Sequence, residues 1–505
     1  MRIRRTIIAA AVVVLLCGAT RAGAAEIDLA YEDVPTLVGA ARGAEFGRCV
    51  AAGDLDGDGA TELVVGAPGV SDTSGVPHAG AAYVFRLDAL SATEYDSRVD
   101  DLAAARFSGS EPRERFATSV AVADLDGDGI NDLAVGAPAA GGSSVAAGAV
   151  YVWFGRTGNW WVGAIDADVR LEGDAAGDRL GSTLLAADLD SDGSDELLVS
   201  APTGGVEGSG SVYVLTGSAL RSAGAIGSVS DLAAAVVVGE SPGDELEGVA
   251  VADTDGDGEE ELLLGSFRAD GGPDGPLDAG VVHFLPAETV MAGGSFRLPA
   301  GAARSLAGRT GRGFFGRAVS SGDIDGDDAD DVLLSAYGSK AGRKKLTAAG
   351  EAFVVFGEPG GSDAPDSLDD PRVVRILSRR KSDVLGLPVL LDDINGDTLD
   401  DIVISARYSD GPDRDRIDCG EVYAFRGSLR SVVAAKTAEV GLADIVLVGG
   451  RENDSIGEAL LALDVDGVRG PELIVGAPDA SRHDDGVLLS RCGMVLIVPG
   501  ELLSR

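Results

Sequence analysis

The chain has 505 residues, of which 45% are hydrophobic and 5% aromatic, and 73 are glycines. Its 82 acidic residues outnumber its 41 basic ones and give a net charge of −41. Such a surface repels phosphates, which argues against binding to nucleic acid or to an anionic membrane and favours a cationic partner. The aliphatic content suffices for a packed core, so wholesale disorder is excluded. The many glycines indicate frequent tight turns.

The first 24 residues have the pattern of a secretory signal peptide. Three arginines among the first five residues precede an apolar run at 6–17, and small residues follow at 22–24. A lipoprotein acylated at Cys17 is the alternative, but Leu16 is a large residue for the position before such a cysteine. No later apolar run reaches the ~18 residues of a membrane span. We therefore expect residues 25–505 to be exported, to a periplasm or to the outside of the cell, as one domain.

The exported part would contain three cysteines, Cys49, Cys419 and Cys492. An odd number cannot pair fully, so a disulfide scaffold is excluded, whereas a single bridge stays open.

One acidic motif recurs seven times, with 64 to 71 residues between successive first acids. It reads Asp-x-Asp-x-Asp-Gly-x-x-Asp/Glu, so oxygen-bearing side chains occupy positions one, three, five and nine. The first six copies place there Asp54, Asp56, Asp58 and Glu62; Asp124, Asp126, Asp128 and Asp132; Asp188, Asp190, Asp192 and Glu196; Asp253, Asp255, Asp257 and Glu261; Asp323, Asp325, Asp327 and Asp331; Asp393, Asn395, Asp397 and Asp401. The seventh keeps Asp464, Asp466 and Glu472, with Val468 at position five.

The sequence around the acidic motif repeats as well. Eight residues before the first acid there is usually a large apolar residue followed by a small one: Phe46-Gly47, Phe116-Ala117, Leu180-Gly181, Phe315-Gly316, Leu385-Gly386 and Ile456-Gly457. The fourth copy keeps only the spacing. Twelve residues after the first acid lies a small residue, which in four copies opens a Gly/Ser-Ala-Pro triplet ending at Pro68, Pro138, Pro202 or Pro478.

Each repeat predicts four short strands. In chain order these are an alternating strand such as 120–123, the acidic loop, an apolar strand such as 133–135, a third strand such as 149–152, and a more polar fourth strand such as 106–109. Four repeated strands of graded polarity are typical of a propeller blade. We therefore predict an all-β, seven-bladed β-propeller with blades starting near 46, 116, 180, 245, 315, 385 and 456. The isolated run at 35–39 is expected to close the last blade as its fourth strand.

The acidic loops are predicted to bind Ca²⁺, because oxygen donors at positions one, three, five and nine suit this ion and Zn²⁺ would take nitrogen or sulfur. An EF-hand is excluded, since it needs Glu at position twelve and flanking helices, whereas position twelve is here Val, Leu or Ile. Loops five and six lack the glycine at position six (Asp328 and Thr398) and are still expected to bind. The seventh, with Val468 and Arg469, is expected to be degenerate.

The combined motifs resemble the FG-GAP repeats of the integrin α-subunit N-terminal β-propeller. The resemblance implies seven blades, Ca²⁺ in the loop between the first and second strands, and a role in adhesion or ligand binding. The chain departs from integrins in carrying a site in nearly every blade and in lacking leg domains, a transmembrane helix and an inserted Asp-x-Ser-x-Ser domain. Integrin-type ligand recognition is therefore not transferred.

Basic residues gather in loops expected on the face opposite the acidic loops, near blades five and six. A site for an anionic ligand, such as a uronic-acid glycan or an acidic protein tail, is one interpretation, and a solvated patch that offsets acid repulsion is the other. The residues are Arg309, Arg312, Lys340, Arg343, Lys344, Lys345, Arg379, Arg380 and Lys381.

These patterns favour an exported, monomeric, calcium-binding module that binds a protein or glycan, with no enzymatic activity and no nucleic-acid partner. A polysaccharide-active enzyme or lectin on the same scaffold, and a structural surface protein without a discrete ligand, are the alternatives. No Gly-x-Ser-x-Gly is present, and the recurrent acid pairs all belong to the acidic loops, so no catalytic residue is nominated. His283 is expected in the core, and Trp160-Trp161 is expected to cover the end of blade two.

Overall fold

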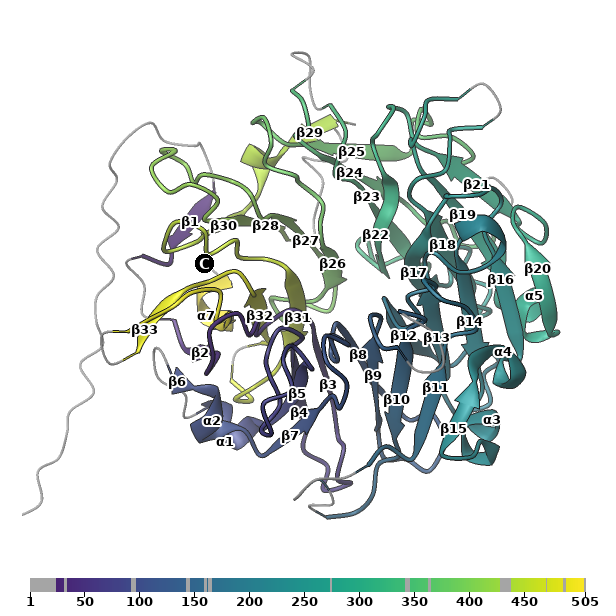
Figure 1. The fold of residues 1–505 in the computed structure, drawn as a ribbon. Coiled ribbons are helices and arrows are strands. Elements are labelled where there is room, and N and C mark those ends of the chain that lie inside the picture. Colours follow the sequence, from purple (N-terminus) through teal and green to yellow (C-terminus); the bar gives the residue numbers. More distant parts are fainter. Residues whose placement is uncertain are drawn as a thin grey trace, which may run out of the picture.

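The computed structural model describes residues 24–503, apart from 31–33, 92–96, 142–145, 159–160, 162–165, 273–274, 341–345, 362–364, 427–436, 469 and 485–486. Seven antiparallel sheets stand around a central axis, with the first strand of each innermost (Figure 1). The predicted seven-bladed β-propeller is confirmed. The predicted signal peptide falls almost entirely outside the described residues.

Every blade has four strands that follow each other from the axis outwards. Blade 1 contains β3 (Val50–Gly53), β4 (Glu62–Ala67), β5 (Ala81–Arg86) and β7 (Ala105–Ser108). Blade 2 contains β8 (Ser119–Ala123), β9 (Asp132–Ala137), β10 (Ala149–Trp153) and β11 (Val169–Glu172). Blade 3 contains β12 (Leu184–Ala187), β13 (Glu196–Ala201), β14 (Ser211–Leu215) and β16 (Ala235–Val238).

The remaining blades repeat this order. Blade 4 contains β17 (Leu246–Ala252), β18 (Glu261–Ser266), β19 (Val281–Pro286) and β21 (Arg304–Ala307). Blade 5 contains β22 (Phe315–Gly322), β23 (Asp331–Ala336), β24 (Glu351–Val355) and β25 (Val373–Leu377). Blade 6 contains β26 (Val389–Asp392), β27 (Asp401–Ala406), β28 (Glu421–Phe425) and β30 (Ile445–Val448). Blade 7 contains β31 (Ala459–Leu463), β32 (Glu472–Ala477) and β35 (Met494–Val498).

An N-terminal strand closes the ring, as predicted. Strand β2 (Thr36–Val38) pairs antiparallel with β35 and is the fourth strand of blade 7. Leu37 lies opposite Val495 in this pair and is fully buried. The two ends of the chain therefore complete one sheet.

Five blades carry a fifth strand that was not predicted. Each fifth strand pairs in parallel with the fourth strand of one blade but precedes, in the chain, the fourth strand of the next blade around the ring. They are β6 (Ser97–Arg98) on blade 7, β15 (Ile226–Ser228) on blade 2, β20 (Gly294–Arg297) on blade 3, β29 (Thr437–Glu439) on blade 5 and β1 (Ala25–Asp28) on blade 6. Neighbouring blades are thus joined at their outer edges as well as through their cores.

The repeated Phe-Gly and Gly-Ala-Pro motifs contact each other. The glycine N–H of the first motif donates to the carbonyl that opens the second motif in the same blade, at 3.0 Å from Gly47 to Gly66 and 2.9 Å from Gly181 to Ser200. The large apolar residue instead bridges to the preceding blade, where Gly80 pairs with Phe116. A Cβ on Gly80 would lie 2.7 Å from the Phe116 nitrogen, so only glycine fits at this position.

Blade 4 shows why its motif looked irregular in the sequence. Leu246 is fully buried like the apolar residue of the other blades, but the pairing of β17 with β18 shifts register between Leu246 and Gly248. A β-bulge therefore changes the spacing by one residue while the packing is kept.

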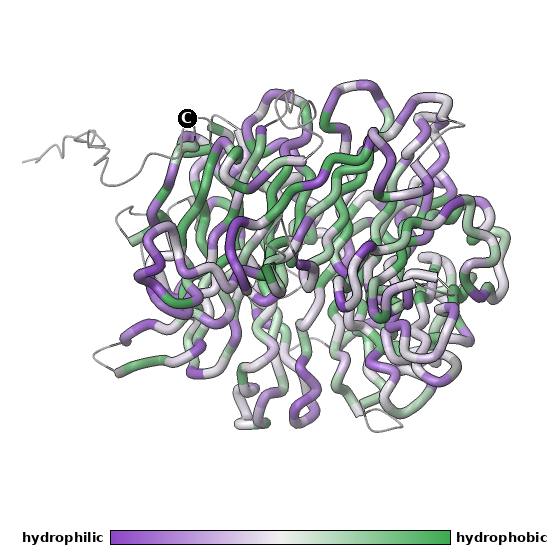
Figure 2. The backbone as a smooth tube through the Cα atoms, turned by 90° about the horizontal axis from the view of Figure 1, so that it is seen from above, coloured by the Kyte–Doolittle hydropathy of each residue, from purple (hydrophilic) through white to green (hydrophobic). Residues whose placement is uncertain are grey.

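The hydrophobic core is divided into seven main clusters, one between each pair of neighbouring blades. Hydrophobic stretches run along the strands, and hydrophilic ones gather in the connecting loops (Figure 2). Cys419 and Cys492 are buried free thiols at the repeat position that Ala79 fills in blade 1, and Cys49 is free as well. They therefore serve packing.

Helices in the described residues are short. They are α1 (Leu87–Ser91), α2 (Val99–Leu102), α3 (Gly217–Ser222), α4 (Val229–Leu232), α5 (Ala287–Met291), α7 (Gly500–Leu503) and the 3₁₀ turns η1 (Val206–Gly208) and η2 (Val440–Leu442). In the described part of the chain, none of these helices has the length and apolar character that crossing a membrane requires. A separate hairpin, β33 (Arg482–Asp484) with β34 (Val487–Leu489), extends from blade 7.

Candidate metal loops and ligand surface

The seven acidic motifs form loops between the first and second strands of the blades, and we number these loops 1 to 7 by blade. The ninth residue is in every case the first residue of the second strand, as Glu62 is of β4 and Asp132 of β9. Because first strands all run in the same direction, the loops share one face of the ring, which we call the loop face (Figure 1).

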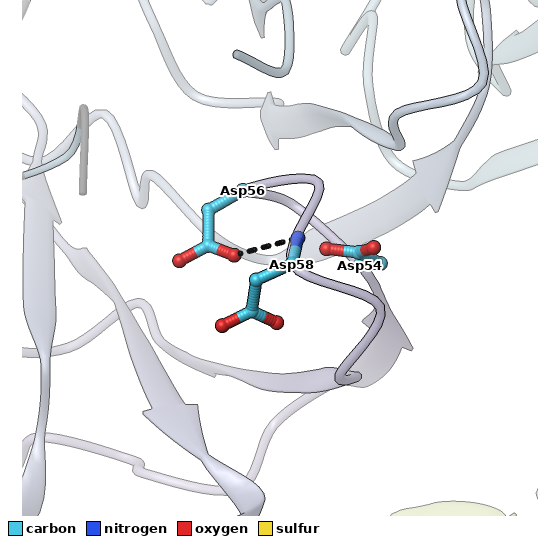
Figure 3. Close-up of side chains that lie close together, drawn as sticks. All are labelled: Asp54, Asp56 and Asp58. Atoms are coloured by element: carbon cyan, nitrogen blue, oxygen red, sulfur yellow. Dashed lines mark hydrogen bonds between the residues drawn. The ribbon is translucent and has the colours of Figure 1, made fainter. Parts of the chain in front are cut away.

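Loop 1 shows how the backbone turns the carboxylates inwards. The two oxygens of Asp54 accept backbone N–H groups of Gly57 at 2.7 Å and Gly59 at 2.8 Å. Asp56 accepts the N–H of Asp58 at 3.3 Å, and the three side chains lie close together at the tip of the loop (Figure 3). The ninth residue, Glu62, accepts the N–H of position two at 3.1 Å.

The hydrogen bond to the ninth residue recurs in loops 2 to 5 and in loop 7. The ninth-position carboxylate accepts the N–H of position two at 3.0 Å in loops 2, 3, 4 and 5 and at 2.8 Å in loop 7. In loops 1 to 5, three carboxylate oxygens from each loop lie within 4.8 Å of one another. The loops are thus cages of hard oxygen donors, which suit Ca²⁺.

The electrostatic environment of the loop acids favours a bound cation. Burial raises the pKa of the ninth-position acid to about 7 for Glu62, Asp132 and Glu196 and to about 8 for Asp331, above ordinary values of 3.8 to 4.5. The neighbouring loop carboxylates raise it further. Without a metal, these groups therefore hold protons near neutral pH.

Whether a metal fits the loops can be judged from buried carboxylate oxygens that have no hydrogen-bond partner among the described residues. The side chain of Asp126 is 3% exposed, yet its Oδ1 has no hydrogen-bond partner among the described residues. Oδ1 of Asp255, at the same position of loop 4, is likewise buried and without such a partner. A buried carboxylate oxygen is costly unless it is paired or coordinates a metal. A hard divalent cation fits this requirement.

Loops 5 and 6 keep the turn without its glycine. Asp328 and Thr398, at position six, adopt φ of 68° and 76°, the left-handed region that glycine occupies in loops 1 to 4. In loop 6 the amide nitrogen of Asn395 donates to Asp401 at 2.7 Å, which leaves its amide oxygen for a ligand role. In loop 7 the side chain at position five, Val468, offers no oxygen and is 50% exposed, and Arg469 lies outside the described residues.

Among the described residues, two arginines form ion pairs with loops 1 and 2, and sequence reasoning missed both. Arg86, the last residue of β5, forms an ion pair with Asp56 in loop 1. Arg221, in α3 of blade 3, forms an ion pair with Asp126 in loop 2. Nothing in the local sequence predicts these contacts, because each arginine lies 30 or more residues from its acid and, for loop 2, in another blade.

The basic residues predicted on the opposite face are only partly available. Arg309 pairs with Asp369 at 2.6 Å and Arg379 with Glu439 at 3.0 Å. Arg380 is 19% exposed, pairs with Glu421 at 3.3 Å and donates to the Gly411 carbonyl at 2.7 Å. The other basic residues of this group that the structure describes, Arg312, Lys340 and Lys381, are exposed, although Arg312 also lies 4.0 Å from Asp278. Arg343, Lys344 and Lys345 lie outside the described residues.

An aromatic and arginine cluster accompanies these bases. Where four blades end their triplet in proline, blades 4, 5 and 6 carry Phe267, Tyr337 and Arg407. The Phe314 ring stacks on Tyr337, and the guanidinium of Arg317 lies 4.8 Å from the centre of the Phe267 ring. The departure from the proline-ending triplet in three consecutive blades was a usable signal for this cluster.

The isolated histidine and tryptophan candidates are largely structural. His283 is 1% exposed, its Nδ1 lies 2.8 Å from the Ser305 hydroxyl, and burial lowers its pKa to about 4. Trp161 is 2% exposed and belongs to the core between blades 1 and 2, whereas Trp160 lies outside the described residues.

Comparison with known families agrees with the repeat pattern. The FG-GAP repeat model matches residues 46–85, 116–153 and 180–215. The chain therefore contains FG-GAP repeats. Human integrin alpha-IIb is 33% identical over 231 residues, which cover 44% of the FG-GAP chain and 20% of the integrin. Integrin alpha-5 of Xenopus laevis is 29% identical over 237 residues, which cover 45% of the chain and 20% of that protein. The predicted relationship to integrin α-subunits is confirmed.

A second group of relatives has the name of an enzyme. The phosphatidylinositol-glycan-specific phospholipase D of Bos taurus is 35% identical over 158 residues, which cover 31% of the FG-GAP chain and 18% of the enzyme. Relatives in four further organisms have the same name. The prediction that the protein is not an enzyme is therefore wrong. The matched part spans about a fifth of the length of these relatives.

Proposed function

We propose that the protein is an exported, calcium-stabilised FG-GAP propeller that serves as a ligand-binding module in adhesion. The observation that carries this proposal is the division of the ring into two faces. Oxygen cages repeat around the loop face, whereas departures from the repeat gather on the opposite face, where connecting loops are free to carry function.

The proposed ions would be held by the acids at positions one, three, five and nine of loops 1 to 6, with Asn395 at position three of loop 6. Bound Ca²⁺ supplies positive charge that lets the buried acids ionise and ties the first strand of each blade to the second. Calorimetric titration of the full chain with Ca²⁺ tests this assignment. About six bound ions are expected, and a chain that binds none contradicts it.

The proposed ligand site lies on the face opposite the loops, over blades 5 and 6. Support comes from the exposed Arg312, Lys340 and Lys381 in the loops of blades 5 and 6 and from the Phe314–Tyr337 stack of blade 5, which together offer positive charge and half-buried aromatic surface. An anionic glycan or acidic protein segment suits this chemistry. An array of neutral and uronic-acid glycans, probed with and without a chelator, is the test. Binding to no glycan and to no acidic peptide would favour a structural role.

Export remains part of the proposal, with cleavage after residue 24 and one propeller domain from residue 25 to 505. The relatives named as integrins support an extracellular role. N-terminal sequencing of the protein recovered from the medium or periplasm checks this. Recovery of the intact N-terminus from the cytoplasm would contradict export.

A second candidate function is action on phosphatidylinositol-glycans, which the relatives named phospholipase D favour. The test is incubation of the purified chain with a phosphatidylinositol-glycan-anchored protein in detergent, with Ca²⁺ present. Transfer of the anchored protein to the aqueous phase supports the activity. Retention in the detergent phase, with a phospholipase D control active, excludes hydrolysis by this chain alone.

A further inference from the structure

In the part of the chain that the structure describes, two of the acidic loops form an ion pair with an arginine of the protein itself. In loop 1 the Arg86 guanidinium pairs with Asp56 and lies 3.6 Å from Oδ2 of Asp58. In loop 2 the Arg221 guanidinium pairs with Asp126 and lies 3.9 Å from Oδ2 of Asp128. In both loops the arginine therefore faces the acids at positions three and five, which are proposed metal ligands.

Aromatic rings of blade 2 fix both guanidinium groups. That of Arg221 lies 3.9 Å from the centre of the Phe154 ring, and that of Arg86 lies 5.8 Å from the centre of the Trp161 ring. A guanidinium over an aromatic face gains a cation–π attraction and loses mobility. The two arginines are thus held in place by the scaffold.

The other loops differ in this respect. Among the described residues, no basic side chain pairs with Asp188, Asp190 or Asp192 of loop 3, and none pairs with the acids of loop 5. In loop 4, Arg304 lies 3.8 Å from the centre of the Phe284 ring and donates to the Thr254 hydroxyl at 3.3 Å, close enough to interact with Asp255 and Glu261, but among the described residues it forms no ion pair with a loop acid. The seven loops are therefore electrostatically unequal although their motifs are alike.

We propose that Arg86 and Arg221 are internal cations that weaken calcium binding in blades 1 and 2 and hold these loops together when calcium is scarce. A fixed positive charge near a bound divalent ion repels it, and at effective protein dielectric constants this lowers affinity by roughly tenfold. The same charge neutralises loop acids that would otherwise repel one another. Loop 3 and loop 5 then fill at lower calcium concentrations than loops 1 and 2. This inference rests on the proposed calcium function.

The tryptophans of the chain provide a local readout. Of the three tryptophans in the sequence, the two that the structure describes, Trp153 and Trp161, lie in the core between blades 1 and 2, beside loops 1 and 2. Tb³⁺, which takes the place of Ca²⁺ at oxygen sites, is excited through nearby tryptophans when the exciting wavelength is too long for tyrosine to absorb. Direct titration of the full chain with Tb³⁺, followed by tryptophan-sensitised luminescence, therefore reports mainly on the metal affinity of these two loops.

The experiment compares the wild type with Arg86→Gln and Arg221→Gln. Each variant should lower the Tb³⁺ concentration that gives half of the maximal luminescence at its loop by roughly tenfold or more, because the arginine charge repels a trivalent ion even more strongly than Ca²⁺. Arg86→Lys keeps the charge and should stay near the wild type. Arg156→Gln is the matched control, because Arg156 pairs with Asp168, which belongs to no acidic loop. Circular dichroism verifies that each variant is folded.

The outcomes separate the two proposals. No saturable Tb³⁺ luminescence, together with no calorimetric binding of Ca²⁺, overturns the proposed calcium function itself. Normal calcium binding with unchanged or weakened Tb³⁺ affinity in Arg86→Gln and Arg221→Gln overturns only the present inference. Weakened affinity would mean that the arginines orient the carboxylates for the metal.

Discussion

The Phe314 ring stacks on the Tyr337 ring, with centroids 5.3 Å apart and planes inclined by 17°. Phe314 ends the turn that leads into blade 5, and Tyr337 follows the second strand of the same blade. The turn holds Phe314 at φ of 55°, an unusual conformation for an aromatic residue. The pair therefore fixes the turn and the loop relative to each other beside the proposed ligand site.

Gly338 makes room for this stack, and its replacement by alanine should disrupt it. An added Cβ would lie 2.6 Å from Cδ2 of Phe314. Overpacking of this kind costs about 1–3 kcal/mol. Urea unfolding of Gly338→Ala measures the loss in free energy of unfolding. Gly224→Ala, where the nearest heavy atom is 4.0 Å away, is the control and should change it little. Equal free energies of unfolding for the two variants would show that the Phe314–Tyr337 stack can shift to admit the added methyl group without loss of stability.

Charge reversal of exposed bases tests the ligand site. The double variant Lys340→Glu with Lys381→Glu should lose most of its retention on an immobilised uronic-acid polymer, because both side chains are exposed on the same face. The wild-type retention should fall as salt is added, since exposed charges are screened. Arg156→Glu changes charge on the loop face and should retain wild-type binding. Equal retention of the wild type, the double variant and Arg156→Glu would contradict the proposed ligand site.

Calcium removal should lower the melting temperature, because an ion bound only by the native state stabilises it. Excess chelator is expected to lower the temperature measured by calorimetry, and readdition of millimolar Ca²⁺ should restore it. Asp190→Ala removes one ligand of loop 3 and should reduce the stoichiometry by about one ion. A melting curve indifferent to both chelator and Ca²⁺ would contradict the assignment.

In chelator, acidification should stabilise the protein. Burial raises the pKa of Asp244 and of Asp383 from 3.8 to about 6. Because each folded-state pKa lies above the unfolded value, the native state binds more protons, and stability is lost as pH rises from 4 through 6. The melting temperature should therefore increase when pH is lowered from 7 to 5. The double variant Asp244→Asn with Asp383→Asn should show a smaller increase.

Closure by the N-terminal strand should contribute strongly to stability. Leu37→Ala opens a cavity at a fully buried position between blades and should cost about 2–5 kcal/mol. Leu277→Ala, at a side chain that is 60% exposed, is the control and should be nearly neutral. Urea unfolding compares the two. Similar values would mean that the ring holds together without this strand.

The repeat period explains why so much of the fold was predictable. Each strand and loop was seen seven times, so the acidic loops and the closing run at 35–39 were recognised by position alone. The fifth strands were missed because β6 and β15 have only two and three residues. A signal existed, since residues 99–105 and 229–235 share the pattern Val-x-Asp-Leu-Ala-Ala-Ala.

Contacts between segments that are far apart in the chain could not be predicted from the repeated motifs. The pairing of Arg221 with Asp126 depends on the angle between blades 2 and 3, which no local motif encodes. The link to enzymes was missed for a different reason. The motifs shared with the phospholipase relatives are those of the propeller, and acids already assigned to loops left no residue to nominate as catalytic.

The outer strands that are exchanged between blades restrict how chimaeric propellers can be designed. A single blade transplanted from a homologue would bring along an edge strand made for its neighbour and would leave another neighbour bare. Functional chimaeras should therefore have their crossover points just after an exchanged strand and before the fourth strand that follows it, so that each exchanged strand comes from the same parent as the edge on which it pairs.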